Sequence, residues 1–284
     1  FALMKPLKGQ LYAGKKSQIR NLETWWRDKD GNYIEKCHVK NSFTIELMKE
    51  CLGSTTQKNA PFGCLIGDSH ARNYLIAARK LLPSFDIKYM TMGHGCAFLP
   101  SSLISNKLDK NASCNQYSKS VASLIAKESR RGDIVFIGQA LKGSAHNQRA
   151  VQEYFDHIKI FANTLTSKSI PVVIFDGIYP SLPPELCMKE VWRPFPNCER
   201  NIDEVRSAYN RFDELAVSLS NSSENIYYAP LRLGLCVNET CGRFTKKGTP
   251  IWHSAGHITE QASGELADML RQNLTQTNIR IPYK

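Results

Sequence analysis

The feature that most constrains the fold is a regular alternation of short apolar runs with amphipathic helical segments, which begins at Phe62. Five apolar runs are predicted to be strands, at residues 62–66, 87–92, 133–137, 171–176 and 226–230. The helical spacing of apolar residues predicts helices over 70–82, 116–129, 147–167, 202–220 and 259–274. Strands that are apolar throughout and separated by helices are typical of a parallel sheet covered on both faces. We therefore expect an α/β fold with three α/β/α layers around a five-stranded, mainly parallel sheet, flavodoxin-like in plan.

The first 58 residues lack this alternation and are predicted to form an N-terminal extension that packs on the main domain. Residues 1–40 are basic and irregular, and the pair Trp25-Trp26 is expected to anchor them by burial. Ile45, Met48 and Leu52 lie at helical spacing and predict one short helix over residues 41–52. We therefore divide the chain into an extension, residues 1–58, and an α/β domain, residues 59–284.

Composition and charge exclude some classes of function. The chain carries a net charge of +11, but its Lys and Arg residues are dispersed along the sequence. No basic stripe with interleaved aromatic residues occurs, so nucleic-acid binding is not expected. No apolar run approaches the ~20 residues that a membrane-spanning helix needs. The chain begins at Phe1 without an initiator Met, as expected of a piece of a longer protein.

Nine cysteines and a set of N-x-S/T sequons indicate an oxidising, secretory environment. Cysteines that are close in sequence give the expected disulfides Cys37–Cys51, Cys96–Cys114, Cys187–Cys198 and Cys236–Cys241. This connectivity is a hypothesis, since spacing alone does not determine which cysteines pair. Cys64 lies within an apolar run and is expected to be a buried thiol. A zinc site is the competing interpretation, but the sequence holds no C-x-x-C pair. The expected glycosylation sites are Asn111, Asn221, Asn238 and Asn273.

The sequence Gly67-Asp68-Ser69-His70 marks the point where the first strand of the domain turns into a helix. Gly67 permits a tight turn. Ser69 is expected beside the helix N-terminus, where free N–H groups and the helix dipole stabilise negative charge. In one interpretation, Asp68 and Ser69 cap the helix, which both residue types do well. In the other, Ser69 is a nucleophile at the carboxyl end of a strand, where ligands bind in open α/β sheets.

The carboxyl ends of parallel strands meet at one edge of a sheet, so residues that follow the other strands are expected near Ser69. A serine nucleophile needs a base, and two histidines just before the last predicted helix, His253 and His257, are the candidates. Backbone N–H groups at Ser69 and in the turn 93–95 would bind an oxyanion, with the side-chain amide of Gln139 as a third donor.

These residues resemble the SGNH (GDSL-like) hydrolase superfamily, most closely the SGNH domain appended to membrane-bound O-acyltransferases of the acyltransferase-3 type. The resemblance covers residues 62–274. Residues 67–71 are similar to the nucleophile block of the family, with Ser69 as its serine. Gly93-His94-Gly95 is similar to the second block, whose glycine supplies an oxyanion N–H, and this implies Gly95 as the oxyanion donor. His257 stands at the histidine of the DxxH motif, which implies that it is the base.

Two positions depart from the family pattern. Ser254 occupies the position of the triad aspartate, and Gly138-Gln139 stands where classical members have an asparagine motif. Loss of the carboxylate that orients the histidine lowers the rate by several orders of magnitude on a serine-protease scaffold. A dyad of Ser69 and His257, oriented by another group, remains chemically possible, with His253 and Asp176 as open substitutes.

The resemblance implies a serine-dependent esterase or O-acyltransferase domain that transfers or hydrolyses acyl esters, with acetyl as the expected group. Its partners would be an acyl donor, a hydroxyl acceptor such as a glycan, and a membrane acyltransferase domain N-terminal to this piece. The domain would then lie outside the cytosol, in the extracellular space or the secretory lumen, tethered to a membrane. No metal or organic cofactor is implied, because acyl transfer through serine needs neither. Ser254 supports an alternative, a catalytically weakened SGNH-fold domain that binds a glycan or a protein partner.

Overall fold

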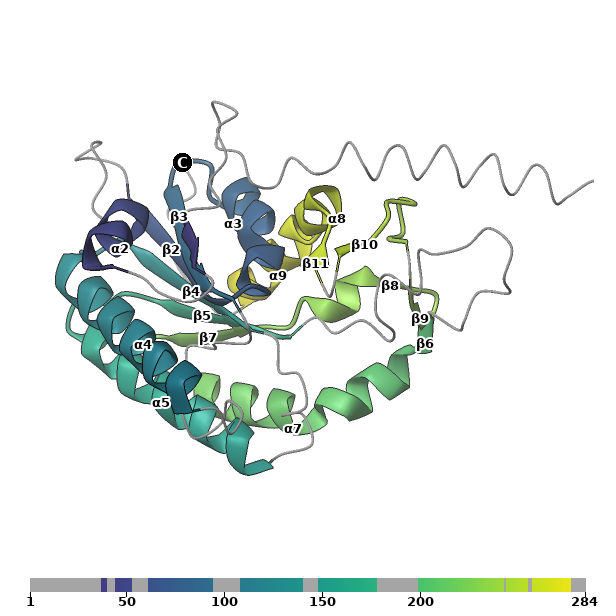
Figure 1. The fold of residues 1–284 in the computed structure, drawn as a ribbon. Helices are drawn as coiled ribbons and strands as arrows, with labels where there is room; N and C mark the ends of the chain where they lie inside the picture. The colour runs from purple at the N-terminus through teal and green to yellow at the C-terminus, as the bar shows by residue number, and fades with distance from the viewer. Residues whose placement is uncertain are drawn as a thin grey trace, which may run out of the picture.

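The computed structural model describes residues 37–39, 44–52, 61–93, 108–139, 148–177, 199–242, 244–254 and 257–276. Its centre is a six-stranded sheet with the strand order β1-β3-β2-β4-β5-β7 (Figure 1). These strands are β1 (His38–Val39), β2 (Phe62–Asp68), β3 (Asp86–Met92), β4 (Ile134–Gly138), β5 (Val172–Phe175) and β7 (Ile226–Ala229). Every neighbouring pair runs parallel. The expected α/β/α fold is confirmed.

Helices cover both faces of the sheet (Figure 1). On one face lie α3 (Leu75–Leu81), α8 (Glu260–Glu265) and α9 (Ala267–Gln276), and on the other lie α4 (Leu108–Glu128), α5 (Gln148–Thr166) and α7 (Ile202–Asn221). The short helix α2 (Ile45–Leu52) lies at the end of the sheet that carries β1 and β3. Strand β2 therefore has β3 on one side and β4 on the other, which makes its carboxyl end the topological switch point of the sheet.

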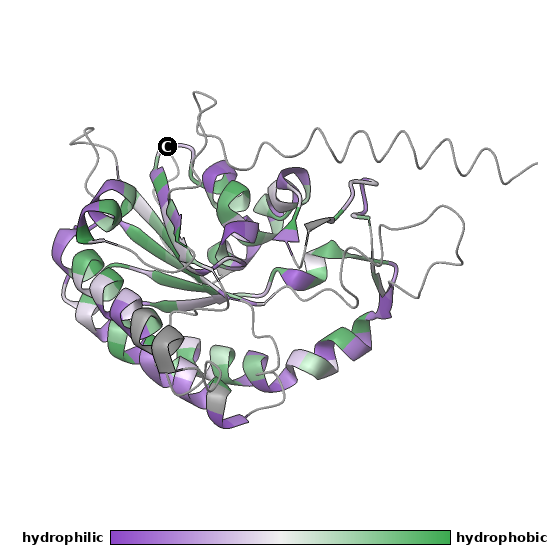
Figure 2. Cartoon of the chain, in the orientation of Figure 1, coloured by the Kyte–Doolittle hydropathy of each residue, from purple (hydrophilic) through white to green (hydrophobic). Residues whose placement is uncertain are grey.

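The burial pattern explains why the sequence predicts these elements well. All seven residues of β2 are buried, as are all residues of β4 and β5, because helices cover both sides of these strands. The apolar stripe of α5 is buried as its spacing predicts, through Val151, Tyr154, Phe155, Ile158 and Phe161. Figure 2 shows the same pattern, with hydrophobic strands and helices that are hydrophobic on one side.

The sheet has one strand more than expected. Strand β1 adds to the edge of β3, where His38 pairs with Thr91 and Val39 with Met92. A disulfide between Cys37 and Cys51 joins this strand to α2. Residues 37–39 and the buried side of α2 belong to the same core as the main domain. The boundary predicted at residue 58 stays a prediction.

Three predicted helices differ in detail from the observed ones. The segment predicted as one helix over 70–82 begins as a 3-10 helix, η2 (Ala71–Tyr74), and continues as α3. The segment 259–274 is divided into α8 and α9. Helix α4 begins at Leu108 rather than near residue 116, because its first turns carry polar residues that give no apolar spacing.

Two small sheets lie outside the main one. Strand β6 (Arg200–Asn201) pairs with β9 (Thr240–Cys241), which pairs with β8 (Cys236–Val237), and a disulfide between Cys236 and Cys241 closes this last hairpin. The 3-10 helix η4 (Arg232–Leu235) leads into it. A separate antiparallel hairpin, β10 (Trp252–Ser254) and β11 (His257–Ile258), precedes α8.

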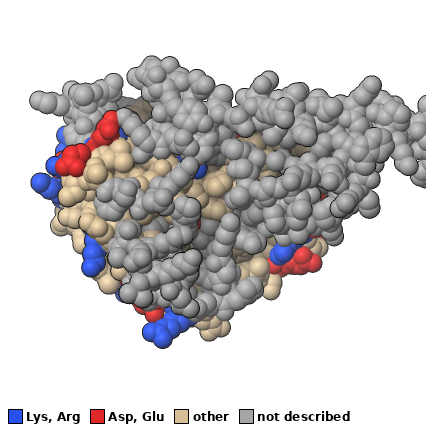
Figure 3. Space-filling model, in the orientation of Figure 1, with Lys and Arg blue, Asp and Glu red and all other residues tan. Residues whose placement is uncertain are grey.

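The described charged side chains include both signs on the face shown in Figure 3. On the face shown in Figure 3, the described Lys and Arg side chains are dispersed and lie beside Asp and Glu. In the part of the chain that the structure covers, no helix is both long enough and apolar enough to cross a membrane. The same residues contain no cluster of three or more His, Cys, Asp or Glu side chains arranged to hold a metal ion.

Candidate active site

Ser69 lies in the turn between β2 and η2, at the switch point of the sheet. The Asp68 carboxylate accepts a hydrogen bond from the backbone N–H of His70 at 2.8 Å, which closes the turn. The residue at the N-cap of η2 is His70, and it makes no side-chain capping bond. Ser69 is half-buried, and its hydroxyl has no hydrogen-bond partner among the described residues. The hydroxyl of Ser69 is therefore not used as a helix cap.

Two glycines bring the backbone of this turn close to the neighbouring strand. Gly67 has a φ of +138°, and a Cβ atom placed on it would lie 1.8 Å from the carbonyl oxygen of Gly138. A Cβ atom on Gly138 would lie 2.7 Å from the Cα of Ala71. Gly67 and Gly138 are also register partners in the β2–β4 pair. The absence of both side chains allows the first turn of η2 to lie directly over the ends of β2 and β4.

His257 reaches this turn from the far end of the sequence. Its imidazole ring lies 4.9 Å from that of His70, centroid to centroid, with the ring planes tilted by 32°. The next residue, Ile258, donates its backbone N–H to the side-chain oxygen of Asn73 at 3.2 Å. The structure thus brings the predicted base next to the residue that follows the predicted nucleophile.

The structure places Ser254 on the strand opposite His257. The two residues are register partners in the β10–β11 hairpin, with an irregularity between Trp252 and Ser254. The first and last positions of the family's DxxH motif, occupied here by Ser254 and His257, are therefore paired across the two strands of this hairpin.

Gln139 follows directly after Gly138 and is 4% exposed. Its side-chain oxygen has no hydrogen-bond partner within the described part of the chain. It lies one residue past the strand end that contacts the serine turn, and its role as a third oxyanion donor stays a prediction. Gly95, the other predicted donor, lies outside the described residues, as do Cys96 and the Cys187–Cys198 pair.

Asp176, one of the two open substitutes for the triad acid, has a different set of partners. Its carboxylate accepts hydrogen bonds from the backbone N–H groups of Leu231 and Arg232, at 2.8 and 2.9 Å. An Arg232 guanidinium nitrogen lies 3.4 Å from the same carboxylate. Asp176 makes no contact with His257 among the described residues. It therefore anchors η4 to the end of β5, and it does not orient the histidine.

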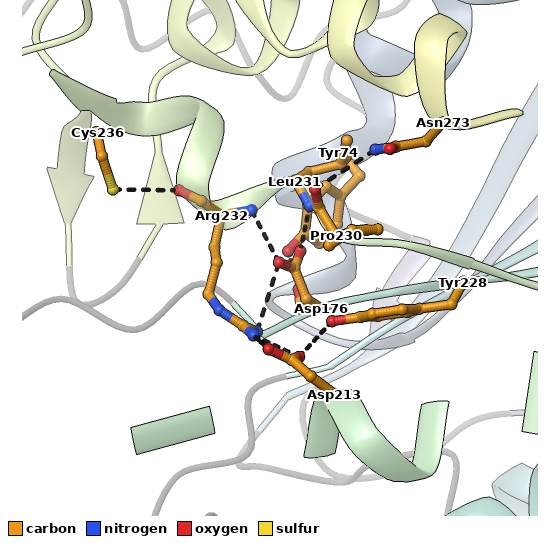
Figure 4. A network of polar contacts seen from close by, with 9 residues as sticks. All are labelled: Tyr74, Asp176, Asp213, Tyr228, Pro230, Leu231, Arg232, Cys236 and Asn273. Carbon is orange, nitrogen blue, oxygen red and sulfur yellow. Dashed lines mark hydrogen bonds and ion pairs between the residues drawn. The ribbon is translucent and has the colours of Figure 1, made fainter. Parts of the chain in front are cut away.

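A buried polar network extends from Asp176 (Figure 4). The Arg232 side chain lies between Asp176 and Asp213, contacts both carboxylates and stacks over the Tyr209 ring at 4.2 Å. Tyr228 donates its hydroxyl to Asp213. Complete burial raises the pKa of Asp176 to about 6, against the opposing effect of Arg232 and the two N–H donors.

This network is connected to the serine turn through one tyrosine. Tyr74, the last residue of η2, donates its hydroxyl to the backbone carbonyl of Asp176. Its ring stacks on Phe175 at 4.3 Å, and burial raises the pKa of its hydroxyl. The sequence analysis missed Arg232, Asp213 and Tyr74, because they are far apart in the chain. The one available signal was a lone Arg between apolar residues directly after a strand.

The cysteines divide into bonded and free groups. Two of the four expected disulfides are present, Cys37–Cys51 and Cys236–Cys241. Cys114 is also disulfide-bonded, although its partner is outside the described residues. Cys64 is free and buried on β2, and burial raises the pKa of its thiol well above the usual range.

The fold and these positions place the chain in the class of three-layer α/β/α proteins with a serine at the carboxyl end of a central strand. The family model described as the SGNH domain fused to AT3 domains matches residues 36–272, and the chain belongs to this family. Membership supports acyl transfer or acyl-ester hydrolysis as the general class of chemistry.

Solved structures that resemble this chain are distant from it in sequence. The periplasmic domain of the lipopolysaccharide acetyltransferase of Salmonella ser. Paratyphi A is 14% identical, with a TM-score of 0.56 over 93% of this chain and 96% of that chain. The C-terminal catalytic domain of Streptococcus pneumoniae peptidoglycan O-acetyltransferase A is 13% identical, with a TM-score of 0.36 over 77% of this chain and 94% of that chain. No curated protein matches this chain.

Proposed function

We propose that this domain is a serine-dependent esterase or O-acyltransferase in which Ser69 is the nucleophile and His257 is the general base. The observation that carries the proposal is the 4.9 Å contact between the rings of His257 and His70, the residue directly after Ser69. A serine hydroxyl without a partner among the described residues, at the switch point of the sheet, supports the same assignment.

The reaction would proceed in two steps. The Ser69 oxygen attacks the acyl carbonyl while His257 accepts the hydroxyl proton, and the carbonyl oxygen becomes an oxyanion. The N–H groups of Ser69 and Gly95, with the Gln139 amide, would bind that oxyanion until the leaving alcohol takes the proton from His257 and departs. An acceptor hydroxyl or water, deprotonated by His257, then attacks the acyl-serine ester. The bond from the acyl carbon to the Ser69 oxygen breaks, and His257 returns the proton to that oxygen. This chemistry needs no metal or organic cofactor.

We further propose acetyl as the acyl group and a glycan or other hydroxyl compound outside the cytosol as the acceptor. The family description supports a fused acyltransferase domain, which in this proposal precedes the present chain and supplies acyl groups across a membrane. The disulfides support an oxidising compartment. The similar Salmonella domain is periplasmic and belongs to a lipopolysaccharide acetyltransferase. Glycosylation at the four sequons belongs to the same proposal.

A second candidate function is supported by Ser254. A site that lacks the carboxylate beside its histidine loses most of the help that a triad acid gives. The domain would then bind a glycan or a protein partner through the same edge of the sheet, without turnover.

The experiment that separates the two functions uses a fluorophosphonate probe and p-nitrophenyl acetate. We expect the unmodified chain to be labelled and to hydrolyse the ester. Ser69→Ala should abolish labelling, and His257→Ala should lower turnover by about 100-fold or more. Ser207→Ala on the exposed side of α7 and His157→Gln on α5 are matched controls away from the turn and should retain both activities. Absence of labelling and of turnover above the Ser69→Ala level would exclude the enzyme and favour the binding domain.

A further inference from the structure

Asn73 connects the serine turn to the strand that carries His257. It lies on η2, four positions after Ser69, and its side chain is completely buried. Its side-chain oxygen accepts the backbone N–H of Ile258 at 3.2 Å. Ile258 is itself fully buried, so this N–H group has no access to water and depends on a protein acceptor.

The strand that receives this bond is not part of the main sheet. Strand β11 has two residues and pairs with β10 in a separate hairpin. Within that hairpin, Thr259 donates its N–H to Ile251 and its hydroxyl to Pro250, which fixes the shape of the hairpin. These bonds do not fix where the hairpin lies relative to Ser69. The bond from Asn73 does, because it joins the hairpin directly to the helix that follows the serine.

Asn73 is suited to fixing the position of the hairpin because η2, on which it lies, is itself held in place by several contacts. The backbone N–H of Asn73 bonds to the carbonyl of His70 at 3.0 Å, and Ala71 lies against Gly138. Tyr74 bonds to the carbonyl of Asp176 at the end of β5. The Asn73 side chain therefore extends from a segment that is anchored to both β4 and β5.

We propose that Asn73 is a positioning residue for His257. By holding the backbone at Ile258, it keeps the His257 ring against His70 and beside Ser69. In the family motif a carboxylate at position 254 orients the histidine. Here Ser254 stands at that position, and the buried amide of Asn73 anchors the histidine through the main chain. The inference rests on the proposed function only for its catalytic consequence, since the placement of His257 can be measured without turnover.

Asn73→Leu tests this assignment, because leucine has a similar size but no acceptor for the Ile258 N–H. A misplacement of about 1 Å at a catalytic group costs on the order of 100-fold in rate, so we expect kcat for p-nitrophenyl acetate to fall by about 10- to 100-fold with little change in KM. If Asn73→Leu does not fold, Asn73→Ala serves the same purpose. The control is Asn225→Leu, at the opposite end of the strands, which removes a buried asparagine that bonds to the carbonyls of Ala162 and Ile170. It should lower thermal stability and leave kcat unchanged.

A double-mutant cycle with His257→Ala distinguishes a positioning role of Asn73 from a purely structural one. If Asn73 acts through His257, Asn73→Leu should lower the residual activity of His257→Ala by less than twofold. An equal loss in both backgrounds would overturn the proposal.

The second readout is independent of activity. In histidine-labelled protein, NMR should detect a nuclear Overhauser contact between the rings of His70 and His257. This contact should persist in Asn225→Leu and vanish in Asn73→Leu. A chain that shows this pattern without esterase activity would contradict the proposed function and support the role of Asn73. An active chain whose ring contact and kcat survive Asn73→Leu would overturn the role of Asn73 and support the proposed function.

Discussion

The imidazole rings of His70 and His257 lie 4.9 Å apart, although one residue belongs to the first helical turn of the domain and the other to its last hairpin. The parallel sheet makes this approach possible, because the turn after β2 and the hairpin before α8 meet at the same edge. The contact places His257, which the family resemblance assigns as the base, beside the residue that directly follows Ser69, the assigned nucleophile.

The close approach of Gly67 and Gly138 predicts that Gly67→Ala disrupts the fold. An added methyl group would overlap the Gly138 carbonyl, and the φ of +138° is unfavourable for any L side chain. We expect a loss in the free energy of unfolding of more than about 3 kcal/mol, measured by urea denaturation. Gly132→Ala is the control, since Gly132 also has a positive φ of +99° but has no atom within 4 Å of the added group. It should cost about 1 to 2 kcal/mol. Equal losses in the two variants would show that the contact with Gly138 is unimportant.

The raised pKa of Asp176 predicts how the stability of the fold depends on pH. Its pKa of about 6 in the folded protein lies above the value of about 3.9 in an unfolded chain, so the folded state holds the proton more strongly between these pH values. Its contribution to the free energy of unfolding is therefore largest below pH 4 and falls by about 3 kcal/mol in all as the pH rises through 6 to 8. The measurement is the difference in free energy of unfolding between the unmodified protein and Asp176→Asn, from pH 4 to pH 8. A difference that stays constant or increases with pH would contradict the assigned shift.

Cys64 is predicted to be unreactive in the folded protein. Its thiol is completely buried on β2, and burial raises its pKa, so very little thiolate forms at neutral pH. We expect no reaction with Ellman's reagent under native conditions and one thiol per chain in denaturant. A larger number of thiols in denaturant would show that one of the pairs Cys96–Cys114 and Cys187–Cys198 is not formed.

The sequons are predicted to differ in glycan occupancy when the chain passes through a glycosylating secretory pathway. Asn221, at the end of α7, and Asn238, in the β8–β9 turn, are both exposed. Asn273 is half-buried, and its side-chain nitrogen, to which a glycan would be attached, donates to the carbonyl of Pro230 at 3.4 Å. Mass spectrometry of peptides should find glycans at Asn221 and Asn238 and none at Asn273. A fully occupied Asn273 would mean that its bond to Pro230 is dispensable.

Much of the main sheet and of the helical layers could be predicted from the sequence, for a physical reason. Strands that are buried on both faces must be apolar throughout, as β2 is, and helices that pack on a sheet must carry an apolar stripe, as α5 does. Strand β1 has two residues, His38 and Val39, which is too short for any periodic pattern. The polar first turns of α4 also gave no signal.

The candidate site also has a part that could be predicted from the sequence and a part that could not. The serine turn could be predicted because its glycine, acid and serine are consecutive, and the turn chemistry is local. The roles of Asn73 and Asp176 could not, because each depends on a backbone group that is distant in sequence, at Ile258 and at Leu231 and Arg232. A hydrogen bond to a backbone group hardly constrains the residue type of the partner, so the sequence does not reveal which residue the partner is.

The position of β1 has a consequence for how the domain behaves under reducing conditions. An uncovered edge strand offers free N–H and C=O groups to other chains and promotes aggregation. Here the edge of β3 at Thr91 and Met92 is covered by His38 and Val39, and the Cys37–Cys51 disulfide joins this short cover to α2. Reduction of that one bond would loosen the cover and leave part of the β3 edge open to self-association. The domain is therefore best produced, stored and assayed under oxidising conditions.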